Sequence, residues 1–211
     1  MKKDSKTKYV VGIDEVGRGC LAGPVMVAVV GINTQIKLPD NLRDSKHLSK
    51  KKREEWSVFI KSSPDICFTI ARVSPRVIDR INISAAANVA ALRAFLRLIK
   101  ILKGEIENIY LDGGLFLKNK KYQKQFLNAK TVIGGDQKID TVKLASIAAK
   151  VKRDRLMTKL GKLYPEYCFE IHKGYGTKLH FKALKRYGPC EIHRRSFIKS
   201  CKLRNRSKRE K

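Results

Sequence analysis

An apolar run at residues 9–13 ends in two adjacent acids, Asp14 and Glu15, and a Gly-Arg-Gly turn follows at residues 17–19. The run predicts a buried strand. Adjacent carboxylates at the end of such a strand repel each other and lose hydration, unless a divalent cation reverses the sign of the local field. The chain carries 47 Lys and Arg against 19 Asp and Glu, a formal net charge of +28. The pattern therefore predicts an acidic, metal-binding centre in an enzyme that acts on a polyanion.

Length and composition favour one large domain, or one domain with a small appendage, because 211 residues of which 43% are hydrophobic can bury a sizeable core. The five cysteines are odd in number and include no Cys-x-x-Cys pair, which argues against a disulfide framework and a zinc knuckle. Residues 1–8 are polar and basic, without an apolar stretch of signal-peptide length, and nowhere do about 18 uncharged apolar residues run consecutively. We expect a cytoplasmic monomer with free thiols and no membrane contact.

The positive charge extends from end to end and predicts binding to phosphate backbones through counterion release. Charge alone does not separate an enzyme from a ribosomal or packaging protein. A non-catalytic basic nucleic-acid-binding protein therefore stays open as the alternative on composition.

Strands and helices alternate along the chain, which is typical of an α/β fold. The first two strands are expected to pair as an antiparallel hairpin, and the helix at residues 83–103 is apolar nearly all round, so it should be buried and end at Gly104. Hydrophobic periodicity predicts strands at residues 9–14, 25–32, 66–73, 106–111 and 131–133, and helices at 49–59, 83–103, 140–163 and 177–187.

Two more strands finish in an acid beside glycines, at Asp112 and at Asp136. Loops at strand ends are where α/β folds build their sites, so Asp14, Glu15, Asp112 and Asp136 are expected to converge at one edge of the sheet. A turn or helix-cap role is the competing interpretation, above all for Asp136 and Asp140, because a helix follows them. Oxygen-only ligands indicate Mg²⁺ or Mn²⁺ rather than zinc.

Two further features have both a functional and a plain structural interpretation. The loop at residues 172–177 would expose Tyr175, which stacks on a nucleotide or is simply half-buried. Side chains at helical spacing on residues 140–163 form either a solvated face or a phosphate contact: Lys143, Ser146, Lys150 and Arg153.

The order and spacing of these blocks resemble the ribonuclease HII (type 2 ribonuclease H) family over roughly residues 8–197. The blocks that carry the resemblance are Asp-Glu-Val-Gly-Arg-Gly at 14–19, Leu-Ala-Gly-Pro at 21–24, Asp-Ser-Lys at 44–46, Leu-Asp-Gly at 111–113, Gly-Asp at 135–136, Ala-Ser-Ile-Ala-Ala-Lys at 145–150, Arg-Asp at 153–154, His-Lys-Gly-Tyr-Gly-Thr at 172–177, His180, Gly-Pro at 188–189 and His-Arg-Arg-Ser-Phe at 193–197.

The resemblance implies a ribonuclease H-like mixed sheet flanked by helices at residues 1–163, a small C-terminal helical substrate-binding part at 164–203 and a disordered basic tail at 204–211. It also implies endonucleolytic cleavage of RNA in RNA/DNA hybrids and 5′ to ribonucleotides embedded in duplex DNA, leaving 3′-hydroxyl and 5′-phosphate ends. Two metal ions can activate the water and stabilise the leaving oxygen, so no histidine or serine nucleophile is required.

Carried over position by position, the resemblance assigns Mg²⁺ or Mn²⁺ binding to Asp14, Glu15, Asp112 and Asp136. Asp136 is preferred over Asp140 because it precedes Ser146 by ten residues, and we expect Asp140 to cap the helix. Substrate contacts fall to Gly17, Arg18, Gly19, Lys46, Ser146, Lys150 and Tyr175, with the Gly-Arg-Gly turn at the 2′-hydroxyl and Tyr175 at the RNA-to-DNA junction.

A dinucleotide-binding turn is a weaker alternative for the segment after the first strand. Acids inside a phosphate-cradling loop would repel the ligand, and residues 25–32 predict a strand where that fold needs a helix. The stronger rival, a basic binding protein without chemistry, needs neither glycine-flanked acids at strand ends nor a long buried helix. Metal dependence separates it from the enzyme.

Overall fold

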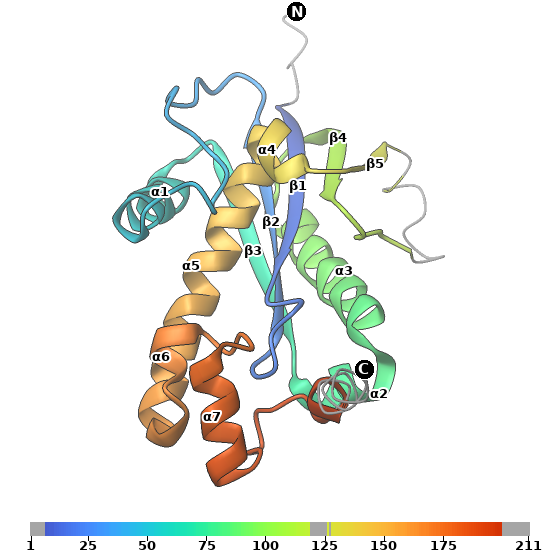
Figure 1. Cartoon of the computed structure of the whole chain (residues 1–211). Helices are drawn as coiled ribbons and strands as arrows, with labels where there is room; N and C mark the ends of the chain where they lie inside the picture. The colour runs from blue at the N-terminus through green and yellow to red at the C-terminus, as the bar shows by residue number, and fades with distance from the viewer. Residues whose placement is uncertain (1–6, 119–125, 127, 200–211) are drawn as a thin grey trace, which may run out of the picture.

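A mixed five-stranded sheet of order β3-β2-β1-β4-β5 forms the centre of the protein, in a computed structural model that describes residues 7–118, 126 and 128–199 (Figure 1). β1 (Lys8–Val16) pairs antiparallel with β2 (Val25–Asn33), which pairs antiparallel with β3 (Ile66–Val73). On its other side β1 pairs parallel with β4 (Glu105–Asp112), and β4 pairs parallel with β5 (Ala129–Val132). The predicted α/β class and the antiparallel hairpin are confirmed.

Helices cover both faces of this sheet (Figure 1). The helix α3 (Ile83–Ile101) packs on one face, whereas α1 (Lys50–Ser62) and α5 (Asp140–Leu163) pack on the other. The remaining helices are short: α2 (Pro75–Ile81), α4 (Gly135–Lys138), η2 (Pro165–Tyr167), α6 (Phe169–His172) and α7 (Lys178–Tyr187). No helix in this part of the chain combines the length and apolar character needed to span a bilayer.

Capping side chains set several helix boundaries. The Ser49 side chain accepts a hydrogen bond from the Lys52 N–H at the start of α1, which continues three residues beyond the predicted end, and Thr177 caps α7 in the same way. The prediction that Gly104 ends α3 is wrong. That helix ends at Ile101, and the Leu102 N–H bonds back to the Leu98 carbonyl.

Close packing at Gly12 brings the start of α5 against β1. A Cβ built on Gly12 would lie 2.2 Å from the carbonyl carbon of Thr141, so only glycine permits this approach. The approach places the first turns of α5 beside the part of β1 that carries Asp14 and Glu15. This packing positions the candidate site.

The segment after α5 packs back onto the lower end of that helix (Figure 1). Tyr167, Phe169 and Ala183 share a core with Met157 of α5 and with Ala22 from the β1–β2 loop. We propose, as the sequence predicted, that residues 164–203 act as a C-terminal substrate-binding part. The predicted basic tail at 204–211 lies outside the described residues.

Candidate metal centre and nucleic-acid interface

The four acids that the sequence singled out come from three neighbouring elements. Asp14 and Glu15 lie near the end of β1, Asp112 ends β4, and Asp136 lies in α4. Because β1 and β4 are parallel neighbours, their carboxyl ends meet at one edge of the sheet. An Asp112 carboxylate oxygen accepts a hydrogen bond from the Asp136 N–H at 3.4 Å. The structure thus brings together segments that are separated by up to about 120 residues.

The Asp14 carboxyl is only 5% exposed, and burial raises its pKa well above the ordinary value. The negative charges of Glu15 and Asp112 raise this pKa further, whereas a hydrogen bond from the Ser146 hydroxyl opposes them. Burial, together with Asp136, likewise raises the pKa of Asp112. Burial is the first cause of both shifts and neighbouring acids the second, so the protein alone disfavours the charged forms of Asp14 and Asp112.

Glu15 has one paired and one orphaned carboxylate oxygen. Its Oε1 lies 3.3 Å from Nη1 of Arg18, but Oε2 is buried and has no hydrogen-bond partner among the described residues. Burial raises the pKa of Glu15, and Arg18 opposes that rise. A buried carboxylate oxygen without a partner is unfavourable, and a cation is the partner that would satisfy it.

Asp136 is held by a lysine from a distant loop. The Lys46 Nζ lies 2.6 Å from Oδ2 of Asp136, whose side chain is 5% exposed while that of Lys46 is 71% exposed. The hydrogen bond to Asp136 raises the pKa of Lys46. Asp44 Oδ1 accepts the Lys46 backbone N–H at 3.0 Å and so orders the turn that presents this lysine.

The donor set fits a divalent cation, although not in its present side-chain arrangement. Within residues 7–118, 126 and 128–199, no group of three or more His, Cys, Asp or Glu side chains stands ready to hold a metal ion. Two of the four acids are engaged by Arg18 and Lys46. The orphaned Glu15 oxygen and the oxygen-only chemistry of the four acids fit Mg²⁺ or Mn²⁺.

Asp140 does not have the role predicted for it. The N-cap of α5 is Ile139, without a side-chain capping bond, and Asp140 is the first helical residue. Its carboxylate pairs with Lys143 at 2.8 Å and is 56% exposed. The prediction that Asp140 caps the helix is therefore wrong, because its side chain bonds forward to the next turn and not to the free N–H groups.

The polar stripe on α5 is not a uniformly solvated face, and its contact with phosphate stays a prediction. Ser146 is buried, with its hydroxyl 2.8 Å from that of Ser45, and Lys150 pairs with Asp154 at 2.9 Å. Arg153 is fully buried and bonds three backbone carbonyls. Nothing in the sequence indicated that Arg153 would be buried. Its partners are backbone carbonyls, which every residue carries, so no acidic residue at a suitable spacing marks them.

The Gly-Arg-Gly turn begins with Gly17 at φ +86°. A Cβ there would lie 2.2 Å from Nε of Arg153, so the position admits only glycine. The Arg18 guanidinium bonds both Glu15 and the Ser84 hydroxyl, the latter at 2.8 Å. The turn therefore lies next to the acidic edge, the edge of the sheet that carries Asp14, Glu15, Asp112 and Asp136.

Tyr175 is partly exposed, at 39%. Lys150 Nζ and Arg153 Cζ lie 6.0 and 5.8 Å from the centre of its ring. Burial, together with Cys20, raises the pKa of Tyr175 to about 12, so its hydroxyl stays protonated at neutral pH. Tyr175 is therefore half-buried, as the plain structural interpretation predicts, and its contact with a nucleotide stays a prediction.

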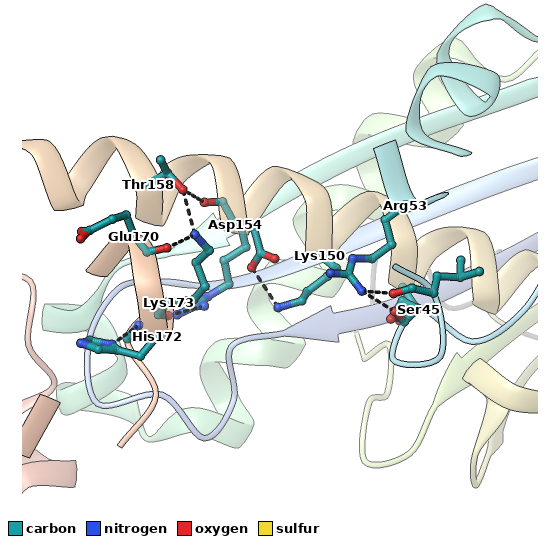
Figure 2. Close-up of polar contacts among 12 residues, drawn as sticks. Ser45, Arg53, Lys150, Asp154, Thr158, Glu170, His172 and Lys173 are labelled. Carbon is teal, nitrogen blue, oxygen red and sulfur yellow. Dashed lines mark hydrogen bonds and ion pairs between the residues drawn. The ribbon is translucent and has the colours of Figure 1, made fainter. Parts of the chain in front are cut away.

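A basic groove of about 670 Å³ runs along α5 between α1 and α6. Figure 2 shows part of it: Lys150 turns toward Asp154, and Lys173 toward Thr158 and Glu170. Burial lowers the pKa of Lys173, and the charges of Lys50 and Lys150 contribute. The charged residues that line the groove are Lys50, Arg53, Glu54, Lys150, Asp154, Arg155, Lys159, Lys162, Glu170 and Lys173, so cations outnumber acids.

Comparison with known proteins gives a consistent result. The family model described as Ribonuclease HII matches residues 11–200. Ribonuclease HII of Caldicellulosiruptor bescii is 43% identical over 194 residues, which cover 92% of this chain and 88% of that protein.

Two solved structures share the fold at 26% identity and a TM-score of 0.67. One is the PCNA:RNase HII complex from Archaeoglobus fulgidus, which covers 89% of this chain and 94% of the solved chain. The other is ribonuclease H2 from Pyrococcus horikoshii OT3, with 94% and 98% covered. The predicted ribonuclease H-like architecture is confirmed.

Proposed function

Because the chain belongs to the ribonuclease HII family of metal-dependent endoribonucleases that act on RNA/DNA hybrids, we propose that it also cuts 5′ to single ribonucleotides in duplex DNA. The products would carry 3′-hydroxyl and 5′-phosphate ends. The observation that supports this most directly is the edge of the sheet where Asp14, Glu15, Asp112 and Asp136 meet, with a buried carboxylate oxygen that has no protein partner in the described part of the chain.

Asp14, Glu15, Asp112 and Asp136 would hold the divalent ions, Mg²⁺ or Mn²⁺. When bound, two such ions supply an activated water and stabilise the leaving oxygen. Ser146 keeps the Asp14 carboxylate oriented by hydrogen bonding, and Lys46 is the exposed counterion of Asp136. Once Asp136 is engaged elsewhere, the Lys46 ammonium is free to bind a substrate phosphate.

Ribose recognition would fall to the turn at residues 17–19 and to Tyr175. The 2′-hydroxyl is the group that lets a protein tell RNA from DNA at a given sugar. Glycines at 17 and 19 let the main chain approach that sugar closely, and Arg18 supplies charge for the neighbouring phosphate. Tyr175, with part of its ring exposed, can pack on the nucleotide.

The basic groove would bind the duplex backbone away from the cleaved bond. From Ser146, beside Asp14, to Lys162 at the far end of the groove, α5 rises about 24 Å, the length of about seven base pairs. Lys150, Lys159 and Lys162 line this path. We therefore propose that affinity for duplexes comes largely from this groove and cleavage specificity from the residue 17–19 turn.

Incubation of the protein with a duplex that carries one ribonucleotide tests the function. We expect a single cut on the 5′ side of the ribose, in the presence of Mg²⁺ or Mn²⁺ and not in EDTA, and no cut in the all-DNA duplex of the same sequence. Equal cutting of both duplexes would exclude ribose recognition. Binding without any cut in either metal would instead favour the non-catalytic binding protein.

Two acid variants separate binding from chemistry. Asp112→Asn keeps the size of the side chain but removes a metal-binding charge, so we expect duplex affinity to persist while cleavage falls by at least about 100-fold. Asp140→Asn is the matched control, because Asp140 is exposed and paired with Lys143. Full cleavage by Asp112→Asn at saturating metal would contradict the proposed ligand set.

A further inference from the structure

Two arginines lie fully buried beneath the loop that joins β1 to β2. Arg153 comes from α5, and Arg194 follows the short segment after α7. Within the described residues neither guanidinium forms a salt bridge with a carboxylate. A buried guanidinium normally needs an acidic partner, so the positive charge here must be satisfied in another way.

Both guanidinium groups are satisfied by backbone carbonyls, but by different ones. Arg194 donates from Nη2 to the Gly17 carbonyl at 2.6 Å, from Nη1 to the Arg18 carbonyl at 2.8 Å and from Nε to the Gly23 carbonyl at 3.0 Å. Arg153 instead donates to the carbonyls of Ala22, Pro24 and Lys173, at 3.1, 3.2 and 2.8 Å. Only Arg194 bonds the turn at residues 17–19.

The contacts of Arg194 determine which way two peptide groups face. In a trans peptide the C=O and the following N–H point in opposite directions, and no cis bond occurs in the described chain. When Arg194 holds the Gly17 and Arg18 carbonyls toward the interior, the N–H groups of Arg18 and Gly19 must point the other way. Within the described residues these two N–H groups donate to no protein acceptor.

We propose that Arg194 is a positioning residue for ribose recognition: it holds the carbonyls of Gly17 and Arg18 inward so that the N–H groups of Arg18 and Gly19 face the substrate as a fixed pair of donors. This inference rests on the proposed function, because it assigns that turn to the ribose. It adds a residue that lies far from the turn in sequence and does not touch the substrate.

The chemistry of arginine explains why this position needs a planar group with several N–H donors and not merely a positive charge. The planar guanidinium presents donors in fixed directions and can engage three carbonyls at once, whereas a lysine ammonium is a compact point charge on a flexible stem. Burial lowers the pKa of Arg194 to about 10, so it remains charged at neutral pH. That charge, directly beneath the turn, also favours the approach of a phosphate.

Arg194 is itself held in place by its neighbours in sequence. Its backbone N–H donates to the Leu21 carbonyl at 2.8 Å. The next two residues, Arg195 and Ser196, donate their backbone N–H groups to the Asp79 carboxylate at 2.9 and 3.0 Å. Asp79 therefore offers a mild way to loosen Arg194 without removing its side chain.

The experiment compares Arg194→Lys with Arg153→Lys, two identical substitutions at fully buried sites. Dissociation constants are measured, in an Asp112→Asn background, for a duplex with one ribonucleotide and for the all-DNA duplex. The selectivity is the ratio of the dissociation constant for the all-DNA duplex to that for the ribonucleotide duplex. We expect Arg194→Lys to lower this ratio by about tenfold or more, with all-DNA affinity unchanged. Arg153→Lys should lose comparable thermal stability but lower the ratio much less, because Arg153 bonds none of the carbonyls at residues 17–19.

Each other outcome decides against the inference. If Arg194→Lys keeps the wild-type ratio, or if Arg153→Lys lowers it equally, the two arginines only stabilise the fold. If Arg194→Lys does not fold, Asp79→Asn takes its place, and an unchanged ratio there overturns the inference in the same way. Wild-type cleavage of the single-ribonucleotide duplex is measured separately, so failure of the proposed function is recognised independently.

Discussion

The ammonium group of Lys46 lies 2.6 Å from a carboxylate oxygen of Asp136, ninety residues away in the sequence. The pair occupies the acidic edge where divalent ions are proposed to bind. Lys46 contacts Oδ2 of Asp136, so a metal ion that takes this oxygen as a ligand would have to displace the lysine. Metal binding and the release of Lys46 are therefore expected to be coupled.

Replacement of Lys46 by methionine should strengthen the response of the protein to metal. Without its counterion the buried Asp136 carboxylate is unsatisfied, which should cost about 1–2 kcal/mol of folding free energy in EDTA. Added Mg²⁺ or Mn²⁺ should then raise the melting temperature more than it does in the wild type. Lys52→Met is the control, since Lys52 pairs with Glu55 at 2.7 Å on the exposed surface of α1. Equal metal-induced shifts in all three proteins would argue against competition between Lys46 and the metal.

Substitutions at Tyr175 should distinguish ring contact from hydroxyl chemistry. Tyr175→Ala removes the ring and should lower kcat/KM on the single-ribonucleotide duplex by about 10-fold or more, the usual range for a lost base-stacking contact. Tyr175→Phe should keep most of the activity, because the tyrosine hydroxyl, with its pKa near 12, does not ionise at neutral pH. Steady-state kinetics on one substrate suffices. A Phe variant as weak as the Ala variant would shift the role to the hydroxyl.

Lysines in the groove along α5 should contribute to affinity without contributing to specificity. Lys159→Gln and Lys162→Gln are each expected to weaken binding to hybrid and all-DNA duplexes alike, and to reduce the slope of log K against log salt by about 0.9. Lys100 on the opposite face of the sheet provides the control substitution, Lys100→Gln. Titrations at several salt concentrations measure the slope, and an unaltered slope would remove the groove from the binding surface.

The C-terminal part should lose stability in mild acid because it buries a chain of neutral histidines. His180 donates from Nδ1 to the Tyr175 carbonyl at 2.9 Å, so its Nε2 accepts from His193, 3.0 Å away, and His193 in turn accepts the Cys190 N–H. Burial lowers the pKa of both imidazoles to about 4. Between about pH 6.5 and 4 the unfolded chain therefore binds protons that the folded chain does not, and the free energy of unfolding falls as pH falls.

Urea denaturation from pH 7.5 to pH 4.5 measures this effect against a double variant, His180→Asn with His193→Asn. The raised pKa values of Asp14, Glu15 and Asp112 act in the opposite sense, since the folded state takes up those protons first. The difference between wild type and double variant removes this common contribution. The free energy of unfolding of the wild type relative to that of the double variant should fall by a few kcal/mol on acidification. A difference independent of pH would show that the histidines are not held neutral.

The sequence predicted the elements whose signals are local. Ser49 and Thr177 mark helix starts because a side-chain oxygen caps the N–H groups three residues on, and the apolar runs at residues 9–13 and 25–32 pair as predicted. The helix end assigned to Gly104 was wrong by a few residues, since backbone hydrogen bonding stops at Leu102.

The convergence of the acids was also within reach of the sequence, because parallel neighbouring strands carry their carboxyl ends to one edge. The partners of those acids were not. Whether Asp136 faces Lys46, and whether Arg153 faces solvent or three carbonyls, depends on how segments about 90 to 130 residues apart pack together. Residue identity and spacing thus determined what chemistry the chain carries, and only the tertiary packing decided which charges meet, because a side-chain contact depends on distance in space and not along the chain.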